Sequence, residues 1–78
     1  MKMKDKFYEK YRNLGISITY FRRMQGLTQQ MVADRMDISY ETMSRIENAN
    51  TGMSMDMMYE LSEALGISLG ELFNHAKQ

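Results

Sequence analysis

Residues 27–48 read LTQQMVADRMDISYETMSRIEN and predict two short helices joined by a tight turn. Thr28 and Ser39 each precede one of these helices, where a hydroxyl oxygen accepts backbone N–H groups that lack a partner inside the helix. Asp37 and Ile38 form the expected turn, with Ile38 directed inward. Since Ala33 is small, the second helix can approach the first closely. The segment therefore predicts a compact pair of crossed helices.

The second of these helices is expected to have one apolar and one polar face. From residue 40 onward, the helical period buries Met43 and Ile46. The residues left on or near the outer face are Tyr40, Glu41, Thr42, Ser44 and Arg45. When two helices cross steeply over a short turn, the N-terminal half of the second helix can reach base edges in DNA. The polar outer face therefore indicates a DNA-reading function.

Several short motifs occur in order along residues 14–73. They are Gly26-Leu27-Thr28-Gln29, Ala33, Ile38-Ser39, Ser44-Arg45-Ile46-Glu47-Asn48, Leu65-Gly66-Ile67-Ser68-Leu69 and Glu71-Leu72-Phe73. In this order they resemble the motifs of the lambda repressor and Cro family of helix-turn-helix regulators, also called the xenobiotic response element family. The resemblance implies an all-α fold, a compact five-helix bundle with the helix-turn-helix at helices 2 and 3.

The same resemblance implies two sets of DNA contacts. The expected base-reading residues are Tyr40, Glu41, Thr42, Ser44 and Arg45. The expected phosphate-binding residues are Thr28, Gln29, Ser39, Asn48, Asn50 and Thr51. Gln29 resembles the phosphate-binding glutamine of the family, and its backbone N–H lies where a helix N-terminus favours an anion. Asn48 either contacts the DNA backbone or ends the helix.

Arg45 is the first choice for base reading, because its planar guanidinium matches guanine O6 and N7. The alternative is an ion pair with Glu41, four residues earlier on the helix. Glu41 in turn either accepts a hydrogen bond from cytosine N4 or interacts with the helix dipole. Glu47 resembles a structural acidic residue of the family, and its expected partner is Arg22 or a nearby backbone N–H.

Departures from the family pattern affect the turns and the expected dimer. Asp37 and Ala49 stand where relatives carry glycine, so a left-handed backbone at Asp37 would carry some cost. The loop over residues 49–54 holds no basic residue, so affinity for DNA should depend more on dimerisation. Relatives pair through the final helix, which implies a dimer interface at Leu69, Leu72 and Phe73. The alternative is that these residues close the core of the monomer.

A length of 78 residues allows one domain over 1–78, with a core at residues 14–74. Upstream of it, residues 1–13 either extend the first helix or form a basic arm. An apolar stripe of helical period favours the long helix and consists of Met3, Phe7, Tyr11, Leu14, Ile18 and Phe21. Gly15 interrupts this stripe at a cost of about 1 kcal/mol relative to alanine. Ile16 and Tyr20 are expected on the opposite, exposed face.

Signals for two further helices follow the loop. Ser54 caps a fourth helix that ends at Gly66, and Ser68 with Glu71 forms a capping box for a fifth. The sequence holds ten methionines. The helical period places five of them in the core, namely Met31, Met36, Met43, Met55 and Met58. Met53 and Met57 are expected in a loop and on an outer helix face.

Charge is distributed unevenly along a chain with no net charge. Residues 1–23 hold seven Lys or Arg against two acids, a balance of +5. Residues 24–48 hold two Arg against four acids, a balance of −2, and residues 49–78 hold one Lys against four acids, a balance of −3. Non-specific affinity for DNA should therefore be modest, because it scales with the phosphates neutralised.

The sequence lacks the residues that several other classes of function require. There is no Cys, and the single His75 is expected to be a solvated residue, so no metal site is predicted. No catalytic residues, cofactor or small-molecule ligand are predicted, because no nucleophile–base pair or phosphate-binding glycine loop occurs. No membrane span or secretory signal is present in the sequence, which predicts a cytoplasmic protein.

The favoured function is a sequence-specific regulator of transcription, expected to be a repressor. Its partner would be double-stranded DNA, bound by a homodimer at an inverted repeat with the third helix in the major groove. The alternative is a protein-interaction module that retains the fold, such as an antitoxin or a restriction-system controller. Zero net charge and the acidic Glu41 on the reading helix keep this alternative open.

Overall fold

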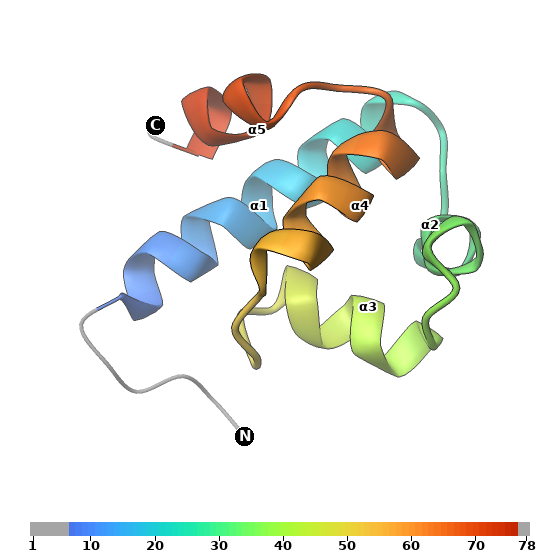
Figure 1. Ribbon diagram of the computed structural model, residues 1–78, viewed down its shortest axis with the longest axis horizontal. Helices are drawn as coiled ribbons and strands as arrows, with labels where there is room; N and C mark the ends of the chain where they lie inside the picture. Colours follow the sequence, from blue (N-terminus) through green and yellow to red (C-terminus); the bar gives the residue numbers. More distant parts are fainter. Residues whose placement is uncertain (1–6, 77–78) are drawn as a thin grey trace.

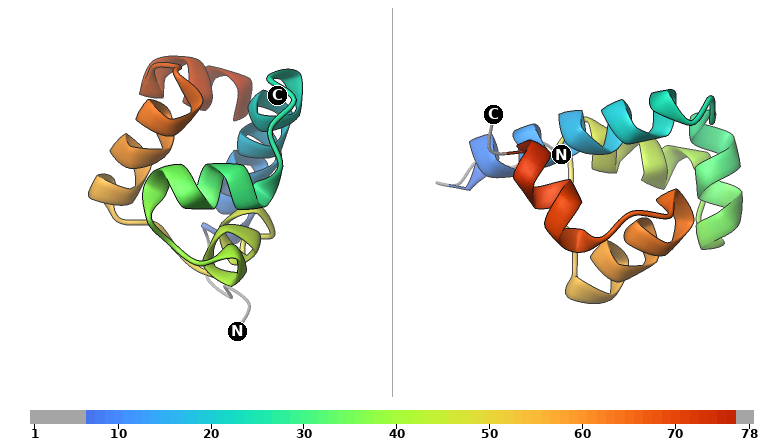
Figure 2. Two further views of the ribbon diagram at one scale, coloured as in Figure 1. Left: turned by 90° about the vertical axis from the view of Figure 1, so that its right-hand side faces the viewer. Right: turned by 90° about the horizontal axis from the view of Figure 1, so that it is seen from above.

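The protein consists of five α-helices, which a computed structural model describes over residues 7–76 (Figure 1). They are α1 (Tyr8–Met24), α2 (Gln29–Met36), α3 (Tyr40–Glu47), α4 (Met55–Leu65) and α5 (Leu69–Ala76). The principal contacts join them in a closed ring, in the order α1, α3, α2, α4, α5 and back to α1. Figure 2 shows this ring from its α2 side. The predicted all-α, five-helix fold is confirmed.

Side-chain caps define four of the helix starts as the sequence predicted. The hydroxyls of Thr28, Ser39 and Ser54 each accept the backbone N–H of the third residue that follows. At α5, Ser68 Oγ accepts from Glu71 N at 3.0 Å, and Glu71 Oε1 accepts from Ser68 N at 2.9 Å. These local hydrogen bonds satisfy N–H groups that the helices leave without partners, so they fix where each helix begins.

Residues with a left-handed backbone conformation lie at the ends of α2 and α4 and just after α3. Asp37 ends α2 with φ 58°, Gly66 ends α4 with φ 67°, and Ala49 follows α3 with φ 58°. The left-handed turn expected at Asp37 is confirmed. Because Asp37 and Ala49 carry a Cβ, each position costs about 1–2 kcal/mol that glycine would avoid.

The first helix begins at Tyr8, so residues 8–13 extend it rather than forming a loose arm. Met3, the first residue of the predicted apolar stripe, lies outside the described residues. Ile16 and Tyr20 are exposed on the outer side of α1, as expected. Among residues 7–76, none of the helices combines the length and hydropathy needed to cross a lipid bilayer.

The core lies inside the ring of helices and receives side chains from all five. Its buried members are Leu14, Ile18, Val32, Ala33, Met36, Met43, Ile46, Leu61, Leu65 and Leu72. Of the five methionines predicted for the core, Met36 and Met43 are buried and Met58 packs against the buried cluster. The helix-turn-helix and the first helix therefore share one core with the last two helices.

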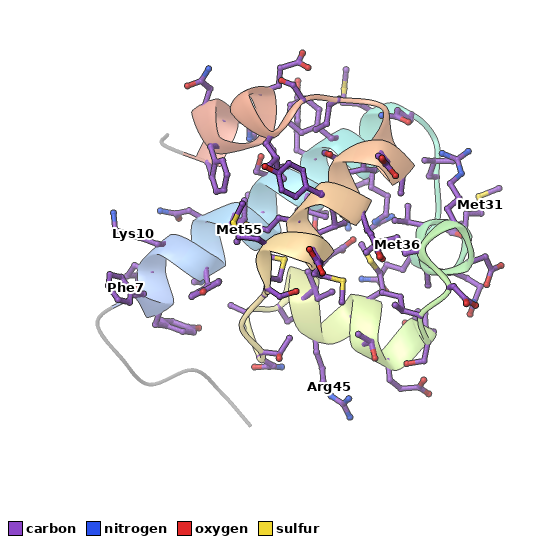
Figure 3. All side chains as sticks on the ribbon, in the orientation of Figure 1. Phe7, Lys10, Met31, Met36, Arg45 and Met55 are labelled. Atoms are coloured by element: carbon purple, nitrogen blue, oxygen red, sulfur yellow. The ribbon has the colours of Figure 1, made fainter. Side chains whose placement is uncertain are left out.

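Three methionines, Met31, Met55 and Met57, correct the sequence prediction. Met31 and Met55 are about half exposed, at 49% and 54%, and Figure 3 shows Met31 on the outer side of α2. Both lie in the first turn of a helix, and the Met31 sulfur accepts the backbone N–H of Thr28 at 3.4 Å. Met53 lies in the expected loop and packs against the core from there, whereas Met57, expected on an outer helix face, packs against the core instead. Near helix ends, the helical period alone therefore misplaced these side chains.

His75 is not the solvated residue that the sequence predicted. Its ring stacks on Tyr20 with centroids 4.2 Å apart, and it meets Phe21 edge to face at 5.4 Å. The Nδ1 atom is buried without a hydrogen-bond partner. The contacts attach the end of α5 to α1. They join residues more than fifty positions apart, so the sequence around His75 gave no signal of them.

Candidate nucleic-acid interface

The exposed side of α3 carries the residues predicted to read bases. Met43, Ile46 and Glu47 form its buried side. On the outer side, Tyr40, Glu41 and Arg45 are exposed, whereas Thr42 and Ser44 are half-buried. Figure 3 shows the Arg45 side chain directed away from the body of the protein. All five predicted base-reading residues thus lie on one accessible side of one helix.

Arg45 and Glu41 do not form the ion pair that their spacing allows. Within residues 7–76, the ion pair of Arg22 with Glu47 is the only one. The side chains of Arg45 and Glu41 make no hydrogen bond with other described residues. Both charged groups are therefore available to a ligand.

Hydrogen bonds within the protein engage four further polar residues along α3 and at its ends, namely Ser39, Thr42, Ser44 and Asn48. Ser39 Oγ and Thr42 Oγ1 are 2.9 Å apart. The Asn48 amide donates to the Ser44 carbonyl oxygen at 2.9 Å and to Ser44 Oγ at 3.3 Å. Asn48 thereby caps the end of α3, which was the alternative to a DNA contact. Its side chain would have to rotate to bind a phosphate.

Two further predicted phosphate contacts, Asn50 and Thr51, lie in the loop that follows α3. Both residues are half-buried. The backbone N–H of Asn50 donates to the Arg45 carbonyl oxygen at 2.9 Å. This bond holds the start of the loop against the end of α3.

The N-terminus of α2 places Thr28 and Gln29 beside α3. Thr28 is exposed and its hydroxyl accepts from Met31 N at 3.1 Å. Gln29 is half-buried, and its side-chain amide donates to Glu47 Oε1 at 2.9 Å. The Gln29 side chain is thus positioned by α3. The sequence did not reveal this link, because its two residues are 18 positions apart.

Glu47 joins α1 and α2 to α3 through a buried cluster of hydrogen bonds. Arg22 donates from Nε to Oε2 at 2.7 Å and from Nη2 to Oε1 at 3.1 Å. Thr19 donates to Oε1 at 2.8 Å. Arg22 Nη1 also donates to the Leu27 carbonyl oxygen at 2.9 Å. Of the two partners expected for Glu47, the structure selects Arg22 and adds Thr19, which the sequence did not mark.

Gly15 allows α1 to lie directly against the end of α3. An added Cβ would overlap the Glu47 carbonyl oxygen and lie 3.0 Å from the Glu47 carbonyl carbon. By helix propensity alone, this glycine is an interruption of the first helix. The close approach of two backbones is its physical reason, and together with the Glu47 cluster it fixes how α3 projects from the fold.

The chain matches a known family over most of its length. The helix-turn-helix family matches residues 18–72, which contain α2, the turn and α3. The chain belongs to the helix-turn-helix family. The match is of the Cro/C1 type, so this helix-turn-helix protein is a DNA-binding protein of the transcriptional-regulator type.

Individual relatives are consistent with this membership. Over 61 residues the helix-turn-helix protein is 33% identical to a competence pilus inhibition repressor of Acinetobacter baylyi, which covers 78% of this chain. Over 59 residues it is 36% identical to the uncharacterized HTH-type transcriptional regulator y4dJ of Sinorhizobium fredii, which covers 76% of this chain. The chain spans 56% and 77% of the lengths of these two proteins, respectively.

A solved structure shows the same fold. The crystal structure of the clp gene regulator ClgR from C. glutamicum matches the helix-turn-helix protein with a TM-score of 0.84 at 24% identity. The match covers 87% of this chain and 88% of that chain. At this identity the likeness supports the fold alone.

The residues predicted for a dimer interface differ in exposure. Leu72 is fully buried, and Ser17 Oγ donates to its carbonyl oxygen at 2.9 Å. Leu69 is half-buried against the core, whereas Phe73 is 41% exposed. Phe73 borders a groove of about 620 Å³ between α1, α4 and α5. Of the three side chains, Phe73 thus offers the most surface to a second subunit.

The electrostatics of Glu47 predict a pH dependence of stability. Burial raises the pKa of Glu47, but hydrogen bonds from Arg22, Gln29 and Thr19 and the charge of Arg22 outweigh burial and hold this pKa below its ordinary value of 4.5. A carboxyl group with a lowered folded-state pKa stabilises the fold fully above its unfolded-state pKa. This stabilisation is lost as the pH falls through the folded-state pKa.

We therefore expect the urea midpoint of unfolding to fall between about pH 5 and about pH 3, partly through protonation of Glu47. The double variant Arg22→Met, Glu47→Leu should show a shallower dependence over the same range. Glu63→Gln, which removes an exposed carboxylate from α4, is the control and should keep the wild-type slope. Equal slopes in the wild type and the double variant would contradict the assignment to Glu47.

Proposed function

We propose that the helix-turn-helix protein is a sequence-specific transcriptional repressor that binds an inverted repeat in double-stranded DNA as a homodimer. The observation that carries this proposal is the outward-directed, unpaired Arg45 on α3. Its guanidinium can donate two hydrogen bonds to guanine in the major groove. The repressor role is supported by the name of the Acinetobacter relative.

The location of the residues expected to bind phosphate supports the same function. Gln29 opens α2, where backbone N–H groups and the helix dipole favour an anion. The basic residues Lys10, Arg12 and Arg23 are exposed on α1. Because residues 24–48 have a negative balance, attraction to phosphate must come from such groups outside the recognition unit and from a second subunit.

The homodimer is supported by size and by the surface around Phe73. A single domain of this size contacts few base pairs, and paired helix-turn-helix units gain specificity by binding half-sites about one helical turn apart. Phe73 and the groove beside it lie across α1, α4 and α5, and α5 and α3 are on opposite sides of the molecule (Figure 1). A second subunit at this surface would leave both recognition helices accessible.

Selection of bound sites from random duplex DNA tests the proposal and is expected to return an inverted repeat. Arg45→Ala should weaken binding to the selected duplex by about ten- to a hundredfold and remove one guanine preference from each half-site. The measurement is fluorescence anisotropy at low salt, repeated as salt rises and with a duplex that holds one half-site.

Arg23→Ala is the matched control, because it removes the same charge from an exposed position on α1. It should weaken binding to all duplexes alike without changing the selected motif. If Arg45→Ala selects the same motif as the wild type, Arg45 does not read a base. If the wild-type protein at micromolar concentration binds no duplex at low salt, the protein-interaction alternative replaces the repressor.

A further inference from the structure

Two charged side chains project from the outer side of α3. Since an α-helix advances by about 100° per residue, Glu41 and Arg45 each lie about 200° around the helix from the buried Met43. Both therefore point away from the core, and both are exposed. They stand one turn apart, yet they form no ion pair. A helix that enters the major groove in this orientation carries a free carboxylate as well as a free guanidinium.

Glu41 lies in the first turn of α3, where the helix dipole favours a negative charge, but no described side chain pairs with it. Asn48, the next residue along the outer side of the helix, is hydrogen-bonded to Ser44. Glu47, the other acidic residue of α3, is buried and paired with Arg22, so Glu41 carries the only free carboxylate of this helix. Close to DNA, the Glu41 carboxylate would lose water and face phosphates of the same charge. This arrangement is unfavourable unless a base donates a hydrogen bond to the carboxylate.

Cytosine is the base whose major-groove edge fits this requirement. Its N4 amino group is a donor and has no acceptor beside it, whereas adenine places the N7 acceptor next to its N6 donor. Guanine presents two acceptors, and thymine presents an acceptor and a methyl group. A carboxylate at this position therefore favours cytosine and rejects guanine and thymine by repulsion as well as by the lack of a hydrogen bond.

We propose that Glu41 determines specificity by requiring a cytosine in each half-site, close to the guanine read by Arg45. This inference rests on the proposed function and names the base composition that α3 selects. Four helical residues span about 6 Å, and successive base pairs are about 3.4 Å apart, so the two bases lie within about two base-pair steps. The half-site then contains a short segment rich in G·C pairs.

The experiment compares the full chain with Glu41→Gln and Glu41→Ala on duplexes that carry each of the four bases at every position of the selected half-site. The wild type should prefer cytosine at one position by about five- to a hundredfold. Glu41→Gln should shift that preference to adenine, because an amide can donate to N7 and accept from N6. Glu41→Ala should reduce the differences there to about twofold and strengthen binding where guanine or thymine was rejected.

Glu60→Gln is the control, because it removes one exposed carboxylate from α4 without changing α3. It should leave the preferences of the wild type unchanged. The inference is wrong if both Glu41 variants keep the cytosine preference, or if they change affinity for every duplex by the same factor as Glu60→Gln. In those cases the wild type still selects a motif, and the proposed function is not contradicted. A wild-type protein that selects no motif overturns both proposals.

Discussion

Replacing Arg22 with methionine is expected to lower the free energy of unfolding by about 3–5 kcal/mol. Removal of the guanidinium leaves the Glu47 carboxylate buried with only Thr19 and Gln29 as donors. It also removes the hydrogen bond from Arg22 to the Leu27 carbonyl oxygen. A domain of this size has a total stability of about 4–12 kcal/mol, so the substitution should remove a large part of it.

Thermal unfolding followed by circular dichroism measures the effect, and the midpoint should fall by more than about 10 °C. Arg23→Met, at the exposed neighbouring position, should change stability by no more than about 0.5 kcal/mol. Adding Glu47→Leu to Arg22→Met should recover much of the loss, because no buried charge remains without a partner. A loss below about 1 kcal/mol in Arg22→Met would show that the cluster contributes little to stability.

Substitution of Gly15 by alanine is expected to lower the free energy of unfolding by about 1–3 kcal/mol. In an exposed helix the same change stabilises by up to about 1 kcal/mol, because alanine has the higher helix propensity. At this position the new Cβ overlaps the Glu47 carbonyl oxygen, so α3 has to move away from α1. The close contact reverses the sign of the effect.

Gly70→Ala provides the matched comparison within the same chain. An added Cβ there would lie 3.7 Å from Ser68 Oγ, an ordinary contact distance. This variant should gain about 0.4–1 kcal/mol. Urea unfolding of both variants gives the two changes directly. A gain in stability for Gly15→Ala would show that α1 and α3 adjust to the extra atom without loss.

Short-range signals predicted most of the fold. The caps at Thr28, Ser39, Ser54 and Ser68 and the left-handed turn at Asp37 were all confirmed. Each of these features depends on hydrogen bonds or backbone conformation within a few residues. The family pattern also predicted the arrangement of α2 and α3, because their connecting turn leaves few ways to pack the two helices.

The errors share a different physical origin. Met31 and Met55 have the spacing of core residues but are exposed in the first turns of α2 and α4, whereas Met57, expected on an outer face, packs against the core. His75 gains its environment from Tyr20 and Phe21 on α1. A helical period gives the direction of a side chain relative to its own helix. It does not say which other helix is present in that direction.

By itself, the sequence determined the five helices, the capped starts of α2 to α5 and the polar outer side of α3, because these depend on interactions within about four residues. The tertiary structure decided between Arg22 and a backbone N–H as the partner of Glu47, added Thr19 and Gln29 to it, and decided which side chains of α3 are available. The Glu47 cluster and the close approach at Gly15 join residues 18 to 32 positions apart. Such contacts arise only after the helices pack, and no local pattern encodes them.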